Sequence, residues 1–325
     1  FISTSPFGVS EPSIMDPLRQ SGFSWDFNTT GRKLKPEELL DAAKDCKALV
    51  AGTENLMPLI EVNPSLKMIS RVGIGLDGVP LHECRRRGIR VSWTPDAVTQ
   101  AVAELTVGLM INSTRFVRFL DEEIRNQGWS RPAGRGIGES VIGLLGFGRI
   151  GSTVASLLSS FQPKKVLVCD IADKTEEISN LRKKGLSIRS ASLEEAVRSS
   201  HILSLHLPLW KATRHLIGEK ELSMMPEDSV IINTARGGIV DEEALELALK
   251  HQKILGAAID VFENEPYSGS LTSLSNCLLT SHIGSCTYSC RVRMEQEALS
   301  DSLRWLRGEP LEQEVPQEQY SYQEA

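Results

Sequence analysis

Residues 140–170 read SVIGLLGFGRIGSTVASLLSSFQPKKVLVCD, and this stretch decides the fold. It opens with an apolar run that has the length and character of a buried strand. Gly146, Gly148 and Gly151 follow in G-x-G-x-x-G spacing, and a helical pattern comes next. A second strand pattern then ends in Asp170. This order predicts a βαβ unit whose first turn is built to approach a ligand.

The three glycines have separate tasks in holding a dinucleotide. Gly146 allows a sharp turn, Gly148 lets backbone N–H groups approach a pyrophosphate, and Gly151 lets the helix pack close to the strand. The helix N-terminus presents unpaired N–H groups and a partial positive charge to phosphate. The alternative is a Rossmann-like turn that holds no nucleotide. The full set of glycines and the terminal acid favour the dinucleotide.

Asp170 distinguishes between the two nicotinamide cofactors. It lies nineteen residues beyond Gly151, where a carboxylate accepts both ribose hydroxyls and repels a 2′-phosphate. Ile171 and Ala172 follow it and offer no cation for such a phosphate. The sequence therefore predicts NAD rather than NADP.

The composition is that of a soluble globular protein, with 325 residues, 41% hydrophobic and 24% charged. This length is enough for two domains with cores of their own. A net charge of -6 argues against nucleic acid or an anionic membrane as a partner. No apolar run approaches the roughly 20 residues that span a bilayer. The start lacks Met and a basic segment, so we expect a trimmed or processed end rather than a signal peptide.

Six scattered cysteines favour buried, reduced thiols in a cytoplasmic protein over disulfides. Cys286 and Cys290 lie four apart without further ligands at zinc-site spacing. No metal is therefore expected.

Strand and helix patterns alternate along the chain, which predicts parallel sheets with right-handed crossovers. Ala97–Leu120 has one long helical pattern and is the expected connector between two domains. Beyond Gly308 the chain is rich in Glu and Gln, with Tyr320 and Tyr322, and we expect an exposed tail. The predicted strands are 1–4, 48–51, 66–72 and 89–93 in the first part, and 141–145, 166–169, 186–189, 201–207, 230–234, 255–261 and 278–280 in the second.

Three stretches place polar groups just after strands, where open α/β sheets have their sites. Arg236 follows one strand, Asp260 and Glu265 follow the next, and His282 follows the last. A guanidinium clamps a carboxylate, an imidazole moves a proton, and a nearby carboxylate holds the imidazole tautomer. Together they suit hydride transfer to a 2-oxo acid.

Each of these residues also has a purely structural interpretation. Arg236 is alternatively a capping or surface cation, and Glu263 or Glu265 a solvated loop acid. His206 rivals His282 as the functional histidine, but Pro208 beside it indicates a loop that lines the cofactor.

The sequence resembles the D-isomer-specific 2-hydroxyacid dehydrogenases, and within them the D-3-phosphoglycerate dehydrogenase branch. The resemblance runs from about Lys67 to Gly308. The motifs that carry it are Gly73-Ile-Gly-Leu-Asp-Gly-Val, Val102-Ala-Glu-Leu, Leu145-Gly-Phe-Gly-Arg-Ile-Gly, Asn233-Thr-Ala-Arg-Gly, Asp260-Val-Phe-Glu-Asn-Glu-Pro and His282-Ile-Gly.

The resemblance implies an α/β protein with two Rossmann-like, doubly wound parallel-sheet domains. The substrate domain would comprise residues 1–96 and 291–325, and the NAD-binding domain, residues 97–290, would be inserted within it. A cleft active site and a homodimer that uses residues 97–120 are also implied. The absence of a regulatory domain after Gly308 implies a short form of the phosphoglycerate enzyme.

Residue roles follow from the same motifs. Arg236 would bind the substrate carboxylate and oxygen, His282 would be the acid/base, and Glu265, directly before Pro266, its partner. Ser281 departs from the family's usual Pro, and Leu207 stands where phosphoglycerate enzymes often have Thr. The implied cofactor contacts are Gly146, Gly148, Arg149, Ile150, Gly151, Asp170, Leu207, Pro208, Thr213, Thr234, Asp260, Gly284 and Ser285. The implied substrate contacts are Arg71, Gly73, Ile74, Gly75 and Arg131.

Arg71 and Arg131 match basic positions that serve the phosphate of phosphoglycerate, although ordinary ion pairing explains them equally well. The expected function is NAD-dependent interconversion of a small D-2-hydroxy acid and its 2-oxo acid, with 3-phosphoglycerate or a related anionic acid as substrate. The alternatives are a glyoxylate/hydroxypyruvate-type reductase and an NAD-sensing, co-repressor-like interaction protein. Formate dehydrogenase is disfavoured, because that branch has Gln where Glu265 stands.

Overall fold

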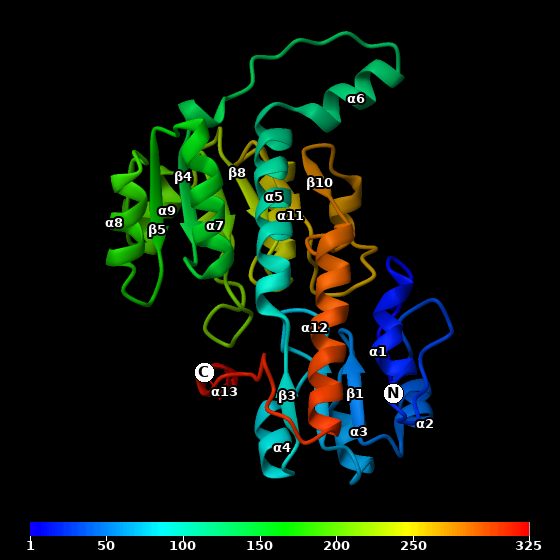
Figure 1. Ribbon diagram of the computed structural model, residues 1–325. Coiled ribbons are helices and arrows are strands. Elements are labelled where there is room, and N and C mark those ends of the chain that lie inside the picture. The colour runs from blue at the N-terminus through cyan, green and yellow to red at the C-terminus, as the bar shows by residue number, and fades with distance from the viewer. Residues whose placement is uncertain (325) are drawn as a thin grey trace. The chain divides into compact units, whose positions relative to one another are not determined.

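The computed structural model describes residues 1–324, without the side chains of Tyr322 and Glu324 (Figure 1). The chain forms two compact units: Phe1–Val98 together with the chain from Ser285 onward, and Thr99–Gly284. We call them unit 1 and unit 2. The boundaries predicted from the sequence fall after residues 96 and 290. The predicted assignment of the substrate to the first part stays a prediction.

Unit 2 contains a seven-stranded sheet in the order β10-β9-β8-β7-β4-β5-β6, and every pair in it is parallel. The chain leaves β4 toward β5 on one side and later returns to pair β7 on the other. The carboxyl ends of β4 and β7 therefore form the topological switch point where such sheets bind ligands. The strands are β4 Val141–Leu145, β5 Lys165–Cys169, β6 Ile188–Ser190, β7 Ile202–Leu205, β8 Val230–Asn233, β9 Gly256–Ile259 and β10 Cys277–Leu279.

Helices cover both faces of this sheet, which explains why its central strands are mostly apolar rather than alternating. One face packs against α5 Pro95–Thr114, α7 Arg149–Leu158 and α8 Thr175–Lys183. The other packs against α9 Leu193–Ser199, α10 Glu219–Met224 and α11 Glu242–Lys250. Short 3₁₀ turns occur at η2 Ile137–Glu139, η3 Ser159–Phe161 and η4 Ser270–Ser273. The expectation of a doubly wound parallel sheet is confirmed for this unit.

The long helix expected over residues 97–120 is two helices, so that prediction is wrong. α5 ends at Thr114, and α6 spans Val117–Arg125. Phe116 between them has φ 57°, a left-handed conformation that interrupts the helix. α6 has no buried residue, and its Val117, Phe119 and Ile124 are exposed.

Unit 1 is built on a three-stranded parallel sheet in the order β1-β2-β3 (Figure 1). The predicted strand at 1–4 is reduced to Ile2, which bridges Phe27 and Val50. One face of the sheet packs against α2 Pro36–Ala43, α3 Met57–Val62 and α4 Leu81–Arg86. The long helix α12 Tyr288–Leu306 contacts β1 and β2, and η1 Pro12–Met15 and α1 Asp16–Arg19 complete the unit. The strands are β1 Ala48–Ala51, β2 Met68–Arg71 and β3 Arg90–Ser92.

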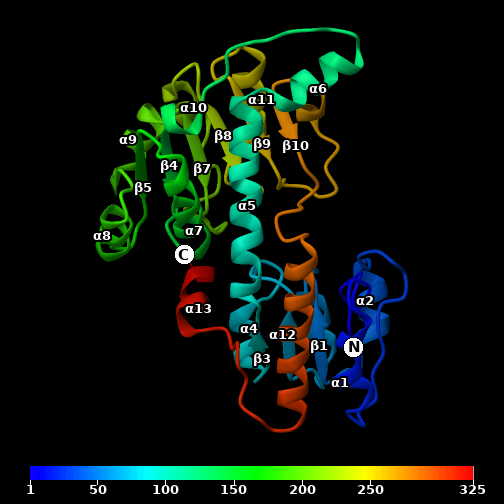
Figure 2. The ribbon, with the colours of Figure 1, turned by 45° about the horizontal axis from the view of Figure 1, so that its top comes forward.

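The predicted exposed tail beyond Gly308 is instead part of unit 1. Glu314 pairs with Ser92 as an antiparallel bridge at the edge of β3. Val315 and Tyr320 are buried in the same core as α2, α3 and α4. The helix α13 Gln317–Glu324 lies beside α4 (Figure 2). The overall polar composition of this segment does not reveal these two buried apolar side chains.

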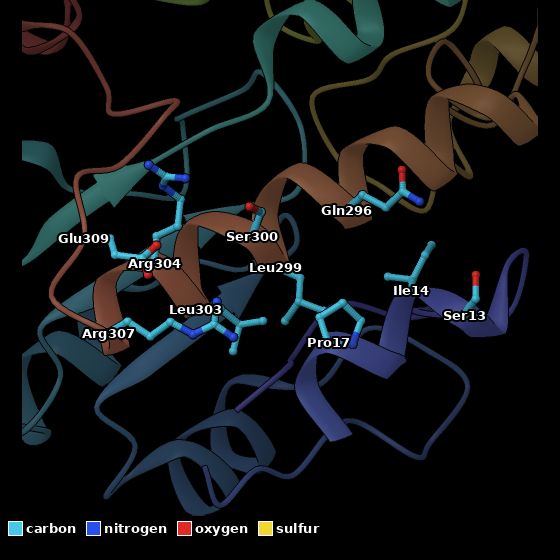
Figure 3. A pocket seen from close by; sticks show the side chains of 10 residues that line it. All are labelled: Ser13, Ile14, Pro17, Gln296, Leu299, Ser300, Leu303, Arg304, Arg307 and Glu309. Carbon is cyan, nitrogen blue, oxygen red and sulfur yellow. The ribbon is translucent and has the colours of Figure 1, made fainter. Parts of the chain in front are cut away.

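No helix in the described part of the chain is long and apolar enough to cross a membrane. A surface cavity of about 260 Å³ lies within unit 1, between η1, α1 and α12 (Figure 3). None of its lining residues is a predicted site residue. They are Ser13, Ile14, Pro17, Gln296, Leu299, Ser300, Leu303, Arg304, Arg307 and Glu309.

Candidate active site

The glycine turn after β4 is shaped by backbone contacts that leave no room for side chains. Gly146 has φ 92°, and a Cβ there would lie 2.4 Å from the carbonyl oxygen of His206. A Cβ on Gly151 would lie 2.2 Å from the carbonyl oxygen of Gly146. Both positions therefore require glycine, one for its conformation and both for close approach. The result is a tight turn from β4 into α7 at the switch point.

Gly148 is different, because it is exposed and no protein atom lies within 4 Å of the position of a Cβ. It is the N-cap of α7 and supplies no side-chain capping hydrogen bond. Arg149 and Ile150 begin the helix. The N-terminus of α7, with no side-chain cap and the positive end of the helix dipole, suits a pyrophosphate.

Asp170 ties this turn to the end of β5. Its Oδ2 accepts a hydrogen bond from the Phe147 N–H at 2.6 Å, and its Oδ1 accepts one from the Ala172 N–H at 2.8 Å. A carboxylate has about four acceptor sites, so capacity remains for ribose hydroxyls. An open glycine backbone, a helix N-terminus and this acid fit the adenosine and pyrophosphate parts of NAD.

The loop after β7 lies against the glycine turn. The Leu207 side chain comes within 3.0 Å of the Cβ position of Gly146. The Thr213 hydroxyl donates to the carbonyl oxygen of Pro208 at 2.7 Å and accepts from the Trp210 N–H at 2.8 Å. Thr213 therefore closes this loop, and its predicted contact with NAD stays a prediction, as do those of Leu207 and Pro208.

His206 is half-buried, and its Nε2 lies 3.0 Å from the Ser204 hydroxyl oxygen. Burial lowers the pKa of His206 to about 3. A histidine that stays neutral throughout the physiological range does not exchange protons there. This favours His282 over its rival.

Arg236 lies in a loop that Asn233 organises. The Asn233 side-chain amide donates to the Arg236 carbonyl oxygen at 2.9 Å and accepts from the Ala235 N–H at 3.0 Å. The Arg236 guanidinium donates to the Ala235 carbonyl oxygen at 2.6 Å. Thr234 is buried, and its hydroxyl lies 2.8 Å from that of Thr106 on α5. This role of Asn233 was not predicted from the sequence, although Asn two residues before a turn is a recognisable signal.

Asp260, after β9, is completely buried and organises the loop that carries His282. Its Oδ1 accepts from the Thr280 hydroxyl at 2.6 Å and the Ile283 N–H at 2.8 Å. Its Oδ2 accepts from the Gly284 N–H at 2.9 Å, and its carbonyl oxygen accepts from the His282 N–H at 2.8 Å. The observed task of the carboxylate is to hold this loop, and its predicted contact with the cofactor stays a prediction.

His282 has φ 55°, a strained conformation for a residue with a side chain. The Asp260 hydrogen bonds compensate for that strain. His282 Nδ1 lies 2.9 Å from Oε2 and 3.1 Å from Oε1 of Glu265. Glu263 instead pairs with Arg214 at 2.8 Å and His215 at 2.7 Å. Glu265 is therefore the acid that orients the imidazole.

Unit 2 thus places Arg236, Glu265 and His282 after the adjacent strands β8, β9 and β10, at one edge of the sheet. Gly284 follows in the loop held by Asp260, and Ser285 is the first residue of the returning part of unit 1. Arg131 is exposed in the loop after α6.

Arg71, at the end of β2 in unit 1, is buried. Its guanidinium donates to the carbonyl oxygens of Gly75, at 2.9 Å, and Val72. It therefore braces the backbone of the Gly73–Gly75 turn. In the described part of the chain, no group accepts a hydrogen bond from the N–H of Ile74 or Gly75.

Comparison with known proteins agrees with this geometry. Residues 107–284 match the family model "D-isomer specific 2-hydroxyacid dehydrogenase, NAD binding domain". The glyoxylate reductase of Thermofilum pendens is 38% identical over 84% of this chain and 82% of its own. The hydroxypyruvate reductase of Thermotoga maritima is 32% identical over 83% and 88%. The D-3-phosphoglycerate dehydrogenase of Methanocaldococcus jannaschii is 33% identical over 87% of this chain but 54% of its own.

Solved structures show the same architecture. The glyoxylate reductase from Paecilomyes thermophila is 28% identical, with a TM-score of 0.84 and 98% of each chain covered. The D-lactate dehydrogenase from Aquifex aeolicus, complexed with NAD and lactic acid, is 26% identical, with a TM-score of 0.82 and 95% of each chain covered.

The sheet, the glycine turn and the acid–imidazole pair define an NAD-dependent oxidoreductase with a Rossmann fold. More specifically, the chain belongs to the D-isomer-specific 2-hydroxyacid dehydrogenase family, and unit 2 contains its NAD-binding domain. Its substrate is a small 2-hydroxy or 2-oxo acid, as in the family.

Proposed function

We propose that this enzyme is a glyoxylate/hydroxypyruvate-type reductase that uses NADH. The Glu265–His282 pair carries the catalytic part of the proposal, since it holds an imidazole at the carboxyl edge of a nucleotide-binding sheet. The similarity to glyoxylate and hydroxypyruvate reductases along most of their length supports the substrate class. The smaller covered share of the phosphoglycerate dehydrogenase and the inward-turned Arg71 give the 3-phosphoglycerate interpretation less support.

The proposed chemistry assigns a separate task to each side chain. Bound NADH supplies the hydride that arrives at the carbonyl carbon of the 2-oxo acid. Because Nδ1 of His282 faces Glu265, the other ring nitrogen, Nε2, delivers the proton to the carbonyl oxygen. Glu265 holds the tautomer and stabilises the imidazolium before transfer. Arg236 pairs with the substrate carboxylate and polarises the carbonyl.

Asp170 supports NAD over NADP in this proposal. A 2′-phosphate would meet a carboxylate already held by the Phe147 and Ala172 N–H groups, with the exposed Ile171 beside it. The repulsion between these anions disfavours NADPH.

The remaining proposals concern assembly and location. The exposed apolar residues of α6, Val117, Phe119 and Ile124, support the homodimer that the resemblance implies. All six cysteines, which lie in the described part of the chain, are reduced thiols, and this supports the proposed cytoplasmic location.

A substrate panel tests the proposed function. NADH absorbance is followed with glyoxylate, hydroxypyruvate, pyruvate and 3-phosphohydroxypyruvate, and again with NADPH. We expect glyoxylate or hydroxypyruvate to give the highest kcat/KM, and NADH to be preferred. The His282→Ala and Arg236→Ala variants should lose turnover by orders of magnitude while still binding NADH.

Two results would redirect the assignment. A preference for 3-phosphohydroxypyruvate restores the phosphoglycerate interpretation. Binding of NADH without turnover of any 2-oxo acid favours an NAD-sensing interaction protein instead.

A further inference from the structure

The C-terminal helix α13 makes an unusual contact with the turn that follows β2. The side-chain amide of Gln323 donates to the carbonyl oxygens of Leu76, at 3.0 Å, and Val79, at 2.8 Å. Its oxygen accepts a hydrogen bond from the N–H of Leu81 at 3.0 Å. One amide from the end of the chain thus makes three hydrogen bonds to a segment more than 240 residues away.

This contact completes the N-terminus of α4. Leu81 is the first residue of that helix, and its N-cap, Pro80, makes no side-chain capping hydrogen bond. First-turn N–H groups need an acceptor from outside the helix. Gln323 supplies that acceptor, so α13 provides the cap that the local sequence lacks.

Residues of the first part of the chain also hold this turn. The Gly73 N–H donates to the Thr94 hydroxyl at 2.8 Å, and Arg71 Nε donates to the Gly75 carbonyl oxygen at 2.9 Å. The Leu56 N–H donates to the Gly78 carbonyl oxygen at 2.9 Å. Gln323 adds hydrogen bonds at Leu76, Val79 and Leu81.

Further contacts anchor α13 on α4. The Tyr320 carbonyl oxygen lies 2.8 Å from Nε2 of His82, and the Arg85 guanidinium lies 3.9 Å from the centre of the Tyr320 ring. Arg85 also donates to the Gln317 side chain at 2.6 Å. Gln323 is therefore presented to the turn by a docked helix rather than by a loose end.

We propose that Gln323 is a positioning residue for the substrate. By fixing Leu76 to Leu81, it sets the orientation of the Ile74 and Gly75 N–H groups, which are directed to the carboxylate of the 2-oxo acid. The inference rests on the proposed function and on the substrate contacts of Gly73, Ile74 and Gly75 that the family resemblance implies. It adds that the C-terminal helix is part of the substrate-binding apparatus.

Kinetics of matched variants test the proposal. Gln323→Ala removes all three hydrogen bonds, and Gln323→Glu keeps the acceptor for Leu81 but places an anion opposite two carbonyl oxygens. Ser321→Ala is the control, since Ser321 is exposed on the same helix. We expect the KM for the preferred 2-oxo acid to rise about tenfold in Gln323→Ala and more in Gln323→Glu. The kcat and the KM for NADH should stay close to wild type, and the unfolding midpoint should fall only slightly, as expected for the loss of a helix cap.

An unchanged substrate KM in Gln323→Ala would overturn the proposal, and so would an equal rise in Ser321→Ala. A fall in stability with unchanged substrate KM would leave a structural role only, and would also overturn it.

A readout without turnover separates this inference from the proposed function. Amide hydrogen exchange of the segment 72–80 should be faster in Gln323→Ala than in wild type, with exchange in unit 2 unchanged. If the wild-type enzyme turns over no 2-oxo acid, the proposed function fails, and this comparison still decides whether Gln323 orders the turn. Equal exchange in both proteins would contradict the inference.

Discussion

Nδ1 of His282 lies 2.9 Å from Oε2 of Glu265, whereas Glu263, two residues earlier, is held by Arg214 and His215. Two acids in one short loop thus have separate partners. The imidazole is oriented through one ring nitrogen, and in the proposed mechanism the other transfers the proton. The following predictions test the parts of this arrangement one at a time.

Replacing Glu265 by Gln should lower kcat by about 100-fold, because an amide keeps the hydrogen bond to His282 but does not stabilise the imidazolium. The dissociation constant for NADH should not change. Glu263→Gln is the matched control, since it removes an acid from the same loop without touching His282. Steady-state kinetics with the preferred 2-oxo acid measure both. Equal losses in the two variants would show that the loop, not the pair, matters.

Replacing Asp260 by Asn should destabilise the enzyme by about 2–4 kcal/mol, because an amide NH₂ group then faces a donor among Thr280, Ile283 and Gly284 in a site without water access. The free energy of unfolding in urea measures this. Asp45→Asn, an exposed position, should change it by less than about 0.5 kcal/mol. A stable Asp260→Asn variant would mean that the buried carboxylate is not what holds the His282 loop.

Two neighbouring substitutions in the glycine turn should differ in their effect on stability, although both weaken NADH binding. Gly148→Ala adds a Cβ with no protein atom within 4 Å, so the fold should be kept while the pyrophosphate loses its close approach to the backbone. We expect the dissociation constant for NADH to rise at least tenfold, as measured by fluorescence titration, with an unchanged unfolding midpoint. Wild-type affinity in this variant would argue against the predicted pyrophosphate site.

Gly151→Ala places a Cβ 2.2 Å from the carbonyl oxygen of Gly146. Because that contact is with backbone, α7 must move away from β4, and stability as well as NADH binding should fall. We expect a loss of about 1–3 kcal/mol in the free energy of unfolding. The comparison with Gly148→Ala separates the packing role of one glycine from the binding role of the other.

His206 should make the stability depend on pH below neutrality. Its pKa falls from 6.5 to about 3 on folding because of burial. The unfolded chain therefore binds a proton that the folded chain does not, and stability is lost as the pH falls from about 6.5 toward 3. The slope from this one group is about 1.4 kcal/mol per pH unit.

Urea unfolding of wild type and His206→Gln at several pH values measures this contribution, and the variant should show a shallower decline. His251→Gln, at an exposed position, should follow the wild-type curve. Parallel curves for wild type and His206→Gln would show that His206 gains a proton in the folded state as well.

The C-terminal segment shows where prediction from composition stops. Residues 309–324 are polar enough to be taken for a tail, yet Val315 and Tyr320 are buried in the core of unit 1 and polar side chains such as Gln323 bond to it. The break between α5 and α6 is similar, because the apolar pattern continues through Phe116 while its backbone turns left-handed. In both cases the deciding contact or conformation involves single residues, which periodicity does not distinguish.

The sequence by itself determined the doubly wound sheet, the NAD turn and the family, because these depend on local patterns: apolar runs, glycine spacing and short ordered motifs. Only the tertiary structure decided that Asp260 and Asn233 shape the loops of the site, and that Gln323 reaches the turn after β2. Those relationships join residues from different strands and from opposite ends of the chain. Their distances follow from packing, which no local pattern encodes.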